Sequence, residues 1–334
     1  MPSVWLARMG RATARSDASL PSSMAETATY DSPLPDRPEL PKVIYVMGAG
    51  RSGSTILGVT LGNCEGVFYA GELDAWLPRS GEPQLGGSER ELLWSTVRDD
   101  VQGAAALFGR EAQRSLERSL APLRVHKWAT RRRLRAPYRR IAEDLYRAVW
   151  RATGAQLIVD TSHYPMRARE LQALGGIELY LVYLVRDPQS VVASFNRKDV
   201  AQYSKHTLTT NVYLWLTNLL CVLVFVRHRR DRRLFVSYED FIANPVSMVR
   251  RILEPTGVRA SSPDLSALHT GVPFQGNRLI KAEVIALEHN YTAPRRESRS
   301  LITAVLQLPW AAVLSRLRPA ATTVASERAY AAPD

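Results

Sequence analysis

The sequence predicts an α/β fold in which a central parallel sheet is flanked by helices. Strand-like apolar runs alternate along the chain with stretches of helical periodicity, a pattern that favours parallel strands joined by helices. The run 177–185 is apolar nearly throughout, as is typical of a central strand buried on both faces. A second apolar run, 43–47, leads into a glycine-rich turn and then into 56–61, which can continue as a helix. Because we find no internal repeat and no reason for a second domain, we expect one large domain in these 334 residues.

Composition indicates a globular protein with an anionic partner. Hydrophobic residues make up 46% of the chain and charged residues 23%, which permits an ordinary core. The net charge of +12 leaves nucleic acid, an acidic membrane and a polyanionic cofactor open as partners. Cys64 and Cys221 do not make a disulfide framework, and no Cys/His cluster suggests zinc. This cysteine usage fits a reducing compartment, and we expect the protein to be cytoplasmic.

The first 40 residues predict a disordered tail. They show no apolar periodicity, and three prolines between positions 33 and 38 exclude a helix interior or a central strand. The segment lacks the apolar core of a secretory signal, although its Arg and Ser content faintly resembles an organelle transit peptide. We favour a mobile tail or an over-long start, with Met24 as a possible first residue.

The next part of the chain predicts a short strand, a loop and several helices. The strand is 67–70, the loop covers 78–90, and the helices cover 91–120 with a break near Gly109. Eight Lys and Arg residues then follow within 124–140 with no acidic residue between them. We interpret this basic run as a solvated face plus a loop, with a polyanion-binding patch as the alternative. A helix that ends at Gly154 comes next.

The second half predicts further strands that alternate with helices. A strand over 156–160 is followed by a loop that begins at Thr161, and by a helix from Pro165 to the glycines at 175–176. After the strand 177–185, Asp187 is a good N-cap and Pro188 suits the first helical position. The remaining predicted elements are a polar, mobile stretch at 198–206, a helix at 211–226, a strand at 234–238, a helix from Asn244 to Gly257, and a last helix at 300–318 broken near Pro309.

The apolar helix 211–226 could be mistaken for a membrane span. Its apolar run is about 14 residues long and contains Thr217 and Asn218, so we expect it to be too short and too interrupted to cross a bilayer. A buried core helix, or one wall of an apolar substrate pocket, is the interpretation that we prefer.

The glycine-rich turn carries the chemistry that the rest of the site would serve. A strand, a glycine turn and a helix form a cradle for phosphate, because backbone N–H groups and the helix dipole point at the anion. The spacing from Gly48 to Gly53, followed by Ser54 and Thr55, is P-loop-like, but Ser54 stands where a nucleotide P-loop has lysine. Arg51 is the available cation within the loop. The alternative is a tight strand–helix turn with incidental Ser and Thr.

Two more strand ends carry polar clusters, at 160–163 and at 186–188. Ligands of an open parallel sheet bind outside the carboxyl ends of its strands, so we expect these clusters and the glycine loop to converge. Arg186 offers a planar fork for a phosphate and Ser194 adds a hydroxyl. The alternative for Arg186 is an ion pair with Asp187 or Asp160.

The two strongest clusters together resemble a known family. Arg51-Ser52-Gly53-Ser54-Thr55 resembles the R-S-G-[ST]-T signature of sulfotransferases that use 3′-phosphoadenosine 5′-phosphosulfate (PAPS), and Arg186-Asp187-Pro188 with Ser194 resembles their R-D-P…S element. The similarity covers roughly 42–285 and is greatest to the bacterial and tyrosylprotein-sulfotransferase-like branch. It implies a sulfotransferase domain over 41–318, between tails at 1–40 and 319–334.

The resemblance also implies the nucleotide contacts. The loop from Gly50 to Thr55 would cradle the 5′-phosphosulfate, and Arg186 and Ser194 would hold the 3′-phosphate. Three weaker matches follow. Tyr238 lies in a segment similar to the family's Y-E-D strand end, and His269 to Arg278, with Asn277, resembles a nucleotide-covering segment. The cluster Asp160-Thr161-Ser162-His163 resembles a D-[ST]-S-K loop of bacterial members, with His163 in the lysine position.

The expected activity is therefore transfer of a sulfonate from PAPS to a hydroxyl of a small-molecule, lipid or glycan acceptor, by in-line displacement and without a metal. Glu72 would be the general base, because it lies in a G-E context 21 residues after Arg51, as in the tyrosylprotein-like branch. Asp74 and His206 are the second and third choices, and His163 or Arg51 would assist the leaving group.

Two other functions remain open. A P-loop kinase is disfavoured by Ser54, and a non-catalytic nucleotide- or polyanion-binding module would tolerate His163 and the basic run. Trp76, Phe68 and Trp215 hint at an apolar acceptor, and the basic run hints at an acidic glycan. We expect no nucleic-acid partner and no transmembrane segment.

Overall fold

The computed structural model describes residues 39–101, 105–196, 206–259, 261–287 and 300–318. The described residues from Leu40 onward belong to one compact unit. The predicted tails, 1–40 and 319–334, and the predicted polar stretch 198–206 lie almost wholly outside the described residues.

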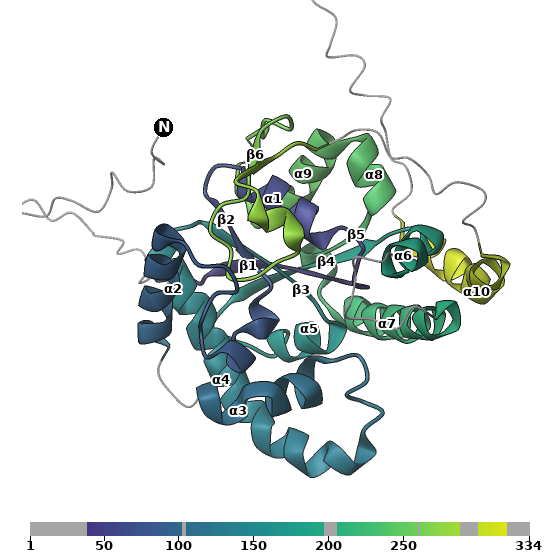
Figure 1. The fold of residues 1–334 in the computed structure, drawn as a ribbon, viewed down its shortest axis with the longest axis horizontal. Coiled ribbons are helices and arrows are strands. Elements are labelled where there is room, and N and C mark those ends of the chain that lie inside the picture. Colours follow the sequence, from purple (N-terminus) through teal and green to yellow (C-terminus); the bar gives the residue numbers. More distant parts are fainter. Residues whose placement is uncertain (1–38, 102–104, 197–205, 260, 288–299, 319–334) are drawn as a thin grey trace, which may run out of the picture. The chain divides into compact units, whose positions relative to one another are not determined.

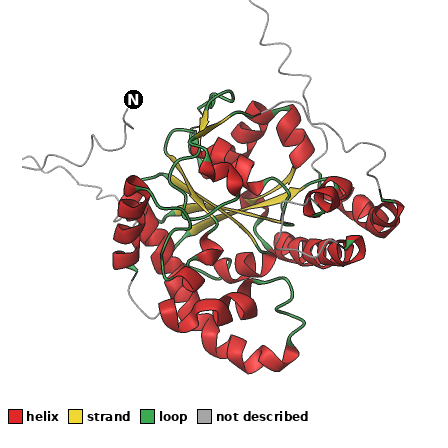
Figure 2. Cartoon of the chain, in the orientation of Figure 1, coloured by secondary structure: helices red, strands yellow, loops and turns green. Residues whose placement is uncertain are grey.

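A five-stranded parallel sheet forms the centre of the fold, as predicted. Its strands are β1 (Lys42–Gly48), β2 (Val67–Gly71), β3 (Leu157–His163), β4 (Glu178–Val185) and β5 (Arg233–Ser237). They lie in the order β2-β3-β1-β4-β5, and every neighbouring pair is parallel. Figure 2 shows the strands enclosed by helices. A separate two-stranded sheet consists of β6 (Leu268–His269) and β7 (Val284–Ile285).

Ten α-helices are assigned within the described residues. They are α1 (Ser54–Gly62), α2 (Ser88–Asp100), α3 (Ala105–Ala112), α4 (Trp128–Thr153), α5 (Pro165–Leu171), α6 (Pro188–Phe195), α7 (Thr207–Arg227), α8 (Tyr238–Ala243), α9 (Pro245–Leu253) and α10 (Leu301–Leu317). Two short helical turns matter for the site: η2 (Leu73–Ala75) and η4 (Gln113–Glu117).

The side chains of β1 alternate between two cores, one on each face of the sheet. Val43, Tyr45 and Met47 pack in the core beneath α4, α5 and α7, whereas Ile44 and Val46 pack in the core with α1, α8 and α9. Figure 1 shows the two sets of helices on opposite faces. All five side chains are fully buried. This double burial explains why the strand is apolar at every position rather than at alternate ones.

Each core contains one cysteine. Cys64 belongs to the core with α1, α8 and α9, and Cys221 belongs to the core on the other face. Both thiols are free and buried. Burial raises the pKa of the Cys64 thiol to about 11 and also raises the pKa of Cys221.

Some predicted boundaries are wrong because long-range pairing overrides local signals. The strand predicted to end at Asp160 continues to His163, which pairs with Met47 of β1 across an irregularity in the register. Most of the basic run lies in α4, which continues through Pro137, so the predicted loop there is confined to its first residues. α10 continues through Pro309, because it packs along its length against α7 rather than standing alone.

The apolar helix is longer than predicted. α7 spans 21 residues and contains an apolar window of 18 residues with a mean hydropathy of 1.7, so by length and composition alone it could cross a membrane. A buried core helix passes the same test, and 44% of this apolar window is buried. The length that we expected for this helix was therefore wrong, and its exposed side is considered below.

Candidate functional site

The loop between β1 and α1 has the backbone of an anion cradle. Gly53 is the residue before α1 and has φ of 93°, and no side chain caps the first turn of the helix. A Cβ at Gly53 would lie 2.3 Å from the ring of Tyr238, and one at Gly48 would lie 2.3 Å from the carbonyl oxygen of Leu184. Glycine is therefore required at both ends of the loop, and the helix N-terminus is left for a ligand.

The remaining loop residues are held by α7 and by the core. The Gly50 N–H donates to the Tyr213 hydroxyl of α7 at 2.9 Å. Ser52 and Thr55 are buried, and Ser54 is half-buried at the start of α1. The residues predicted to contact the phosphosulfate thus lie together in one loop.

Two arginines meet above this loop. Arg51 has φ of 69°, a left-handed backbone conformation that is uncommon for residues other than glycine. Arg186, which follows β4, donates from Nη1 to the Arg51 carbonyl oxygen at 3.2 Å. The Nε atoms of Arg51 and Arg186 are both buried and have no hydrogen-bond partner among the described residues. Buried cationic donors without acceptors fit an anionic group such as a phosphate.

The surroundings of Arg186 argue against the ion pairs considered for it. Asp187 caps α6 instead, where its Oδ2 accepts from the Ser190 N–H and hydroxyl, both at 2.9 Å. Asp160 pairs with Arg167, with Oδ2 and Nη2 3.3 Å apart. The guanidinium of Arg186 lies over the ring of Tyr238, 4.6 Å from its centre. Ser194 lies in the second turn of α6 and is half-buried.

Glu72 lies directly after β2 with a perturbed carboxyl group. Burial, followed by the nearby charge of Asp160, raises the pKa of Glu72 to about 7, while Arg51 and Arg118 oppose the rise. Its backbone N–H donates to the Gln275 carbonyl oxygen at 2.7 Å. A carboxyl group with a pKa near neutrality is suited to accept a proton during a reaction.

The two alternative bases lie in different surroundings. Asp74, in η2, is buried, and its Oδ2 accepts from Gln113 Nε2 at 3.0 Å. Burial raises its pKa well above the usual value. The third choice, His206, is exposed as the N-cap residue of α7.

His163 is the last residue of β3 and has φ of 57°. Its ring lies 4.2 Å from that of Tyr164. Burial and the charge of Arg118 lower the pKa of His163 to about 4. The imidazole is therefore neutral near pH 7, unlike the lysine that it replaces in the motif.

Arg118 is a basic residue of this site that the sequence analysis missed. Its guanidinium lies 4.7 Å from the centre of the Tyr164 ring and also donates to the Tyr164 hydroxyl. It lowers the pKa of both Glu72 and His163, so its charge acts on both groups. It stands in a stretch that we expected to be an ordinary helix, and no local motif marks it.

A buried ionic network supports the site from beneath. Arg167 of α5 donates from Nη1 to Glu117 Oε1 at 2.7 Å and from Nη2 to Asp160 Oδ2 at 3.3 Å. Tyr138 and Tyr146 donate to these two carboxylates, each at 2.6 Å. The sequence analysis noted Asp160 but did not foresee its partners. The network fixes the end of β3 that carries His163.

The predicted nucleotide-covering segment runs beside β2. The Phe274 N–H donates to the Ala70 carbonyl oxygen at 2.9 Å, and Gly71 forms a bridge with Gln275. Asn277 Oδ1 accepts from the Arg278 N–H at 2.6 Å, and the Arg278 side chain is exposed. The structure therefore places Asn277 and Arg278 at the β2 edge, next to the Glu72 segment, whereas Arg186 follows β4.

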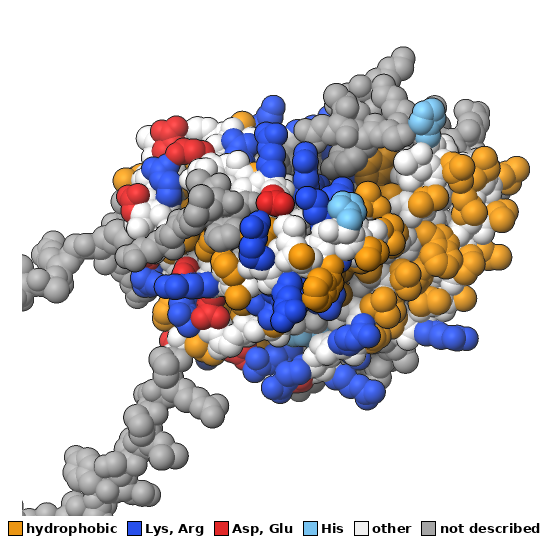
Figure 3. All heavy atoms as spheres, turned by 90° about the horizontal axis from the view of Figure 1, so that it is seen from below, with side chains coloured by type: hydrophobic (Ala, Val, Ile, Leu, Met, Phe, Trp, Pro, Cys, Tyr) orange, Lys and Arg blue, Asp and Glu red, His pale blue; other side chains and the backbone are white. Residues whose placement is uncertain are grey.

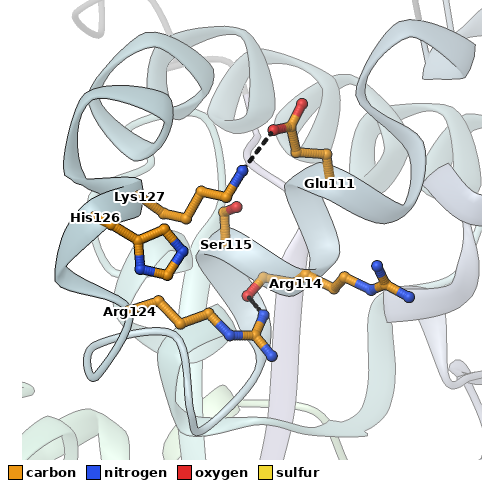
Figure 4. A pocket seen from close by; sticks show the side chains of 6 residues that line it. All are labelled: Glu111, Arg114, Ser115, Arg124, His126 and Lys127. Atoms are coloured by element: carbon orange, nitrogen blue, oxygen red, sulfur yellow. Dashed lines mark hydrogen bonds and ion pairs between the residues drawn. The ribbon is translucent and has the colours of Figure 1, made fainter.

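A basic cavity of about 540 Å³ opens where the basic run begins. Figure 4 shows Lys127 and Arg124 on one wall and Glu111 and Arg114 on the other, and His126 and Ser115 complete the lining. Lys127 Nζ lies 3.8 Å from Glu111 Oε1, and Arg124 donates to the Arg114 carbonyl oxygen at 3.2 Å. Within the described residues we find no group of three His, Cys, Asp or Glu side chains that could hold a metal ion.

The chain is similar to proteins of a known family. The model of a family described as "Sulfotransferase family" matches residues 41–262. No curated protein matches the sequence. Among solved structures, the "Sulfotransferase Domain from the Curacin Biosynthetic Pathway" is 18% identical, with 81% of this chain and 98% of that chain covered and a TM-score of 0.49. The sulfotransferase domain of the Synechococcus PCC 7002 olefin synthase is 20% identical, with 83% and 97% covered and a TM-score of 0.48.

Proposed function

Because the chain belongs to the sulfotransferase family, we propose that it transfers a sulfonate from PAPS to a hydroxyl group of an acceptor. One observation carries the choice of PAPS. Arg51 and Arg186 present buried Nε atoms without partners beside a glycine loop and an uncapped helix N-terminus. A nucleotide with anionic groups at both its 5′ and 3′ positions would satisfy both arginines.

The nucleotide would be held by residues from three strand ends. The N-terminus of α1 and Arg51 would bind the 5′-phosphosulfate, and Arg186 with Ser194 would bind the 3′-phosphate. Tyr238 supports the Arg186 guanidinium from below through its ring. When bound, PAPS supplies the sulfonate, and its 3′,5′-bisphosphate is the leaving group that takes the electron pair of the broken S–O bond.

Glu72 would accept the proton of the attacking hydroxyl at a carboxylate oxygen. Its pKa of about 7 keeps a useful fraction ionised near neutral pH and makes the ionised form a competent base. Arg118 would keep this carboxyl group from becoming too basic, because its positive charge favours the ionised form. Neutral His163 would act as a hydrogen-bonding group, while Arg51 would supply the charge beside the leaving group.

We propose a hydroxylated small molecule, lipid or glycan as the acceptor, and a reducing, cytoplasmic setting. The free thiols of Cys64 and Cys221 are compatible with that setting. The basic cavity at Lys127 lies close in sequence to Arg118 and would suit an acceptor that carries negative charge.

Titration calorimetry with PAPS, its desulfated product and ATP tests this function. A sulfotransferase should prefer PAPS and its product to ATP, whereas a P-loop kinase should prefer ATP. Incubation with labelled PAPS and a cell extract should then yield a labelled, sulfated product. PAPS binding without any transferred label would support a non-catalytic binding module instead.

A further inference from the structure

α7 and α10 are joined to each other by polar side chains. Asn211 of α7 donates from Nδ2 to Thr303 Oγ1 of α10 at 3.0 Å, and Gln307 Nε2 donates to Asn211 Oδ1 at 2.9 Å. Trp215 donates from its ring N–H to the Leu306 carbonyl oxygen at 3.0 Å. The centres of the Trp215 and Trp310 rings lie 5.0 Å apart, so the contacts on α10 advance from Thr303 to Trp310 as those on α7 advance from Asn211 to Trp215, and the two helices run in the same direction.

The outward sides of the same two helices are apolar. On α10, Leu301 is 83% exposed, Val305 is 71% exposed and Leu308 is 70% exposed. On α7, an exposed stripe recurs at helical spacing. Its members are Leu208, Val212, Trp215, Leu219, Leu223 and Val226. We call these residues, with Ile302 and Val313, the apolar face, and Figure 3 shows apolar side chains gathered over this region at the right of the view.

This distribution is the reverse of that of a helix on a water-facing surface. α10 buries Thr303 and Gln307 and exposes Leu301, Val305, Leu308 and Val313, while Leu314 and Leu317 pack against the core. In water, burial of the apolar stripe and exposure of the polar one would be favoured. Helices surrounded by lipid show the arrangement seen here, with polar side chains joining the helices and apolar ones outside. A contiguous exposed apolar patch of this kind marks an interaction site.

The charge around the apolar face favours an anionic partner. Neither α7 nor α10 contains an Asp or Glu, and the exposed arginines Arg227 and Arg316 stand in the last turns of the two parallel helices. Arg230 follows shortly after α7 and is also exposed. Figure 3 shows Lys and Arg side chains along the lower edge of the apolar region. A second copy of the chain would bring a net charge of +12 against another +12, whereas anionic lipid headgroups complement it.

We propose that the apolar face docks on the surface of a bilayer that contains anionic lipids. α7 and α10 would lie in the plane of the interface, with the side chains of the apolar face among the acyl chains and Arg227 and Arg316 at the headgroups. They would not cross the bilayer, because the other side of α7 packs against α5, β1 and β4. This docking is independent of the transferase reaction proposed above.

Sedimentation of the full chain with vesicles tests the proposal. We expect binding to vesicles of phosphatidylcholine with phosphatidylglycerol, much weaker binding to phosphatidylcholine alone, and loss of the difference at high salt. The double variant Val305→Asn/Leu308→Gln should weaken binding by about tenfold or more, because two apolar side chains no longer enter the lipid. The matched control Leu92→Gln/Leu123→Gln changes two exposed apolar residues outside the apolar face and should bind as the wild type does.

A charge-matched pair of variants tests the headgroup contact. Arg227→Gln/Arg316→Gln should reduce vesicle binding and the salt dependence of that binding. Arg132→Gln/Arg140→Gln also removes two positive charges, but from α4, and should leave both quantities unchanged. Thermal unfolding of each variant shows whether it is folded, and reduced vesicle binding counts only for folded variants. Equal binding by Val305→Asn/Leu308→Gln and its control would overturn the proposal. So would a dimer in analytical ultracentrifugation that Val305→Asn/Leu308→Gln dissociates, because the apolar face would then bind a second copy.

Discussion

The guanidinium of Arg186 lies 4.6 Å above the Tyr238 ring, and the same ring fills the space where a Cβ of Gly53 would lie. The Tyr238 ring therefore both positions the Arg186 guanidinium and requires a glycine at position 53 of the loop. A planar cation stacked on a ring keeps its edge donors free for a phosphate. The two parts of the proposed nucleotide site, the glycine loop for the 5′ group and Arg186 for the 3′-phosphate, are thus joined through contacts with Tyr238.

Arg186→Ala should weaken binding of PAPS and of its desulfated product by about 2–3 kcal/mol, the scale of a lost hydrogen bond to a charged group. Adenosine 5′-phosphosulfate, which lacks the 3′-phosphate, should lose much less. Calorimetry with both ligands measures the difference, and Arg151→Ala, at an exposed ion pair with Asp100, serves as the control. Equal losses for the two ligands would contradict the assignment of Arg186 to the 3′-phosphate.

Glu72→Gln should lower kcat by about 10²–10⁴-fold, the usual contribution of a general base. PAPS affinity should stay nearly unchanged, because the residue acts on the acceptor. In the wild type, activity should rise with pH through about 7, since the base works when ionised and its pKa is about 7. Asp74→Asn is the matched comparison, because Asp74 is the second candidate. If Asp74→Asn alone removed the rise, the base would be Asp74.

Arg118→Ala should move the acidic limb of the pH profile to higher pH. Arg118 lowers the pKa of Glu72, so its removal raises that pKa and delays ionisation of the base as pH increases. Arg118→Lys retains a positive charge near Glu72 and should therefore retain most of the wild-type pH profile. An unmoved limb in Arg118→Ala would show that this charge does not act on the base.

His163→Gln should leave the pH profile unchanged near neutrality. With a pKa lowered to about 4, the imidazole is already neutral there, so it contributes no limb of its own. Steady-state rates across the neutral range provide the measurement. A fall in wild-type activity with rising pH that His163→Gln abolishes would instead show that the imidazolium is the working form.

Arg167→Ala should destabilise the fold by about 3–5 kcal/mol, because it leaves two buried carboxylates, Glu117 and Asp160, without their cation. Arg229→Ala removes an exposed pair with Asp231, which water and salt screen, so its effect on stability should be far smaller. Denaturant unfolding of the two variants measures both values. A similar cost for the two would mean that water or another cation compensates the buried carboxylates.

Most of the fold was predictable because the residues that indicate each strand, helix and turn lie next to one another in the sequence. β4 begins one residue later than predicted and ends at the predicted Val185, and Asp187 and Pro188 start α6 as expected. The glycine loop was also predictable, since its strand, turn and helix are contiguous in sequence. By contrast, β3 runs beyond Asp160 because it pairs with β1, which lies more than a hundred residues away in the sequence.

The parts of the site that escaped prediction are assembled by packing. Arg118 and Glu117 follow one another in a stretch with no motif, yet Arg118 reaches Tyr164 and Glu117 reaches Arg167. The neutral state of His163 likewise depends on burial and on a charge supplied from another element. Such environments exist only in the folded chain, so the pattern of residue types could not indicate them.

The two buried cysteines offer one native reporter for each side of the sheet. A thiol reacts as the thiolate, and both thiols are shielded by burial and by a raised pKa, so each can be alkylated only when its own core opens. Labelling of Cys64 follows opening beneath α1, and labelling of Cys221 follows release of α7 from the sheet. The chain therefore carries its own probes for comparing local unfolding on the α1 face of the sheet with local unfolding on the α7 face, with no engineered label.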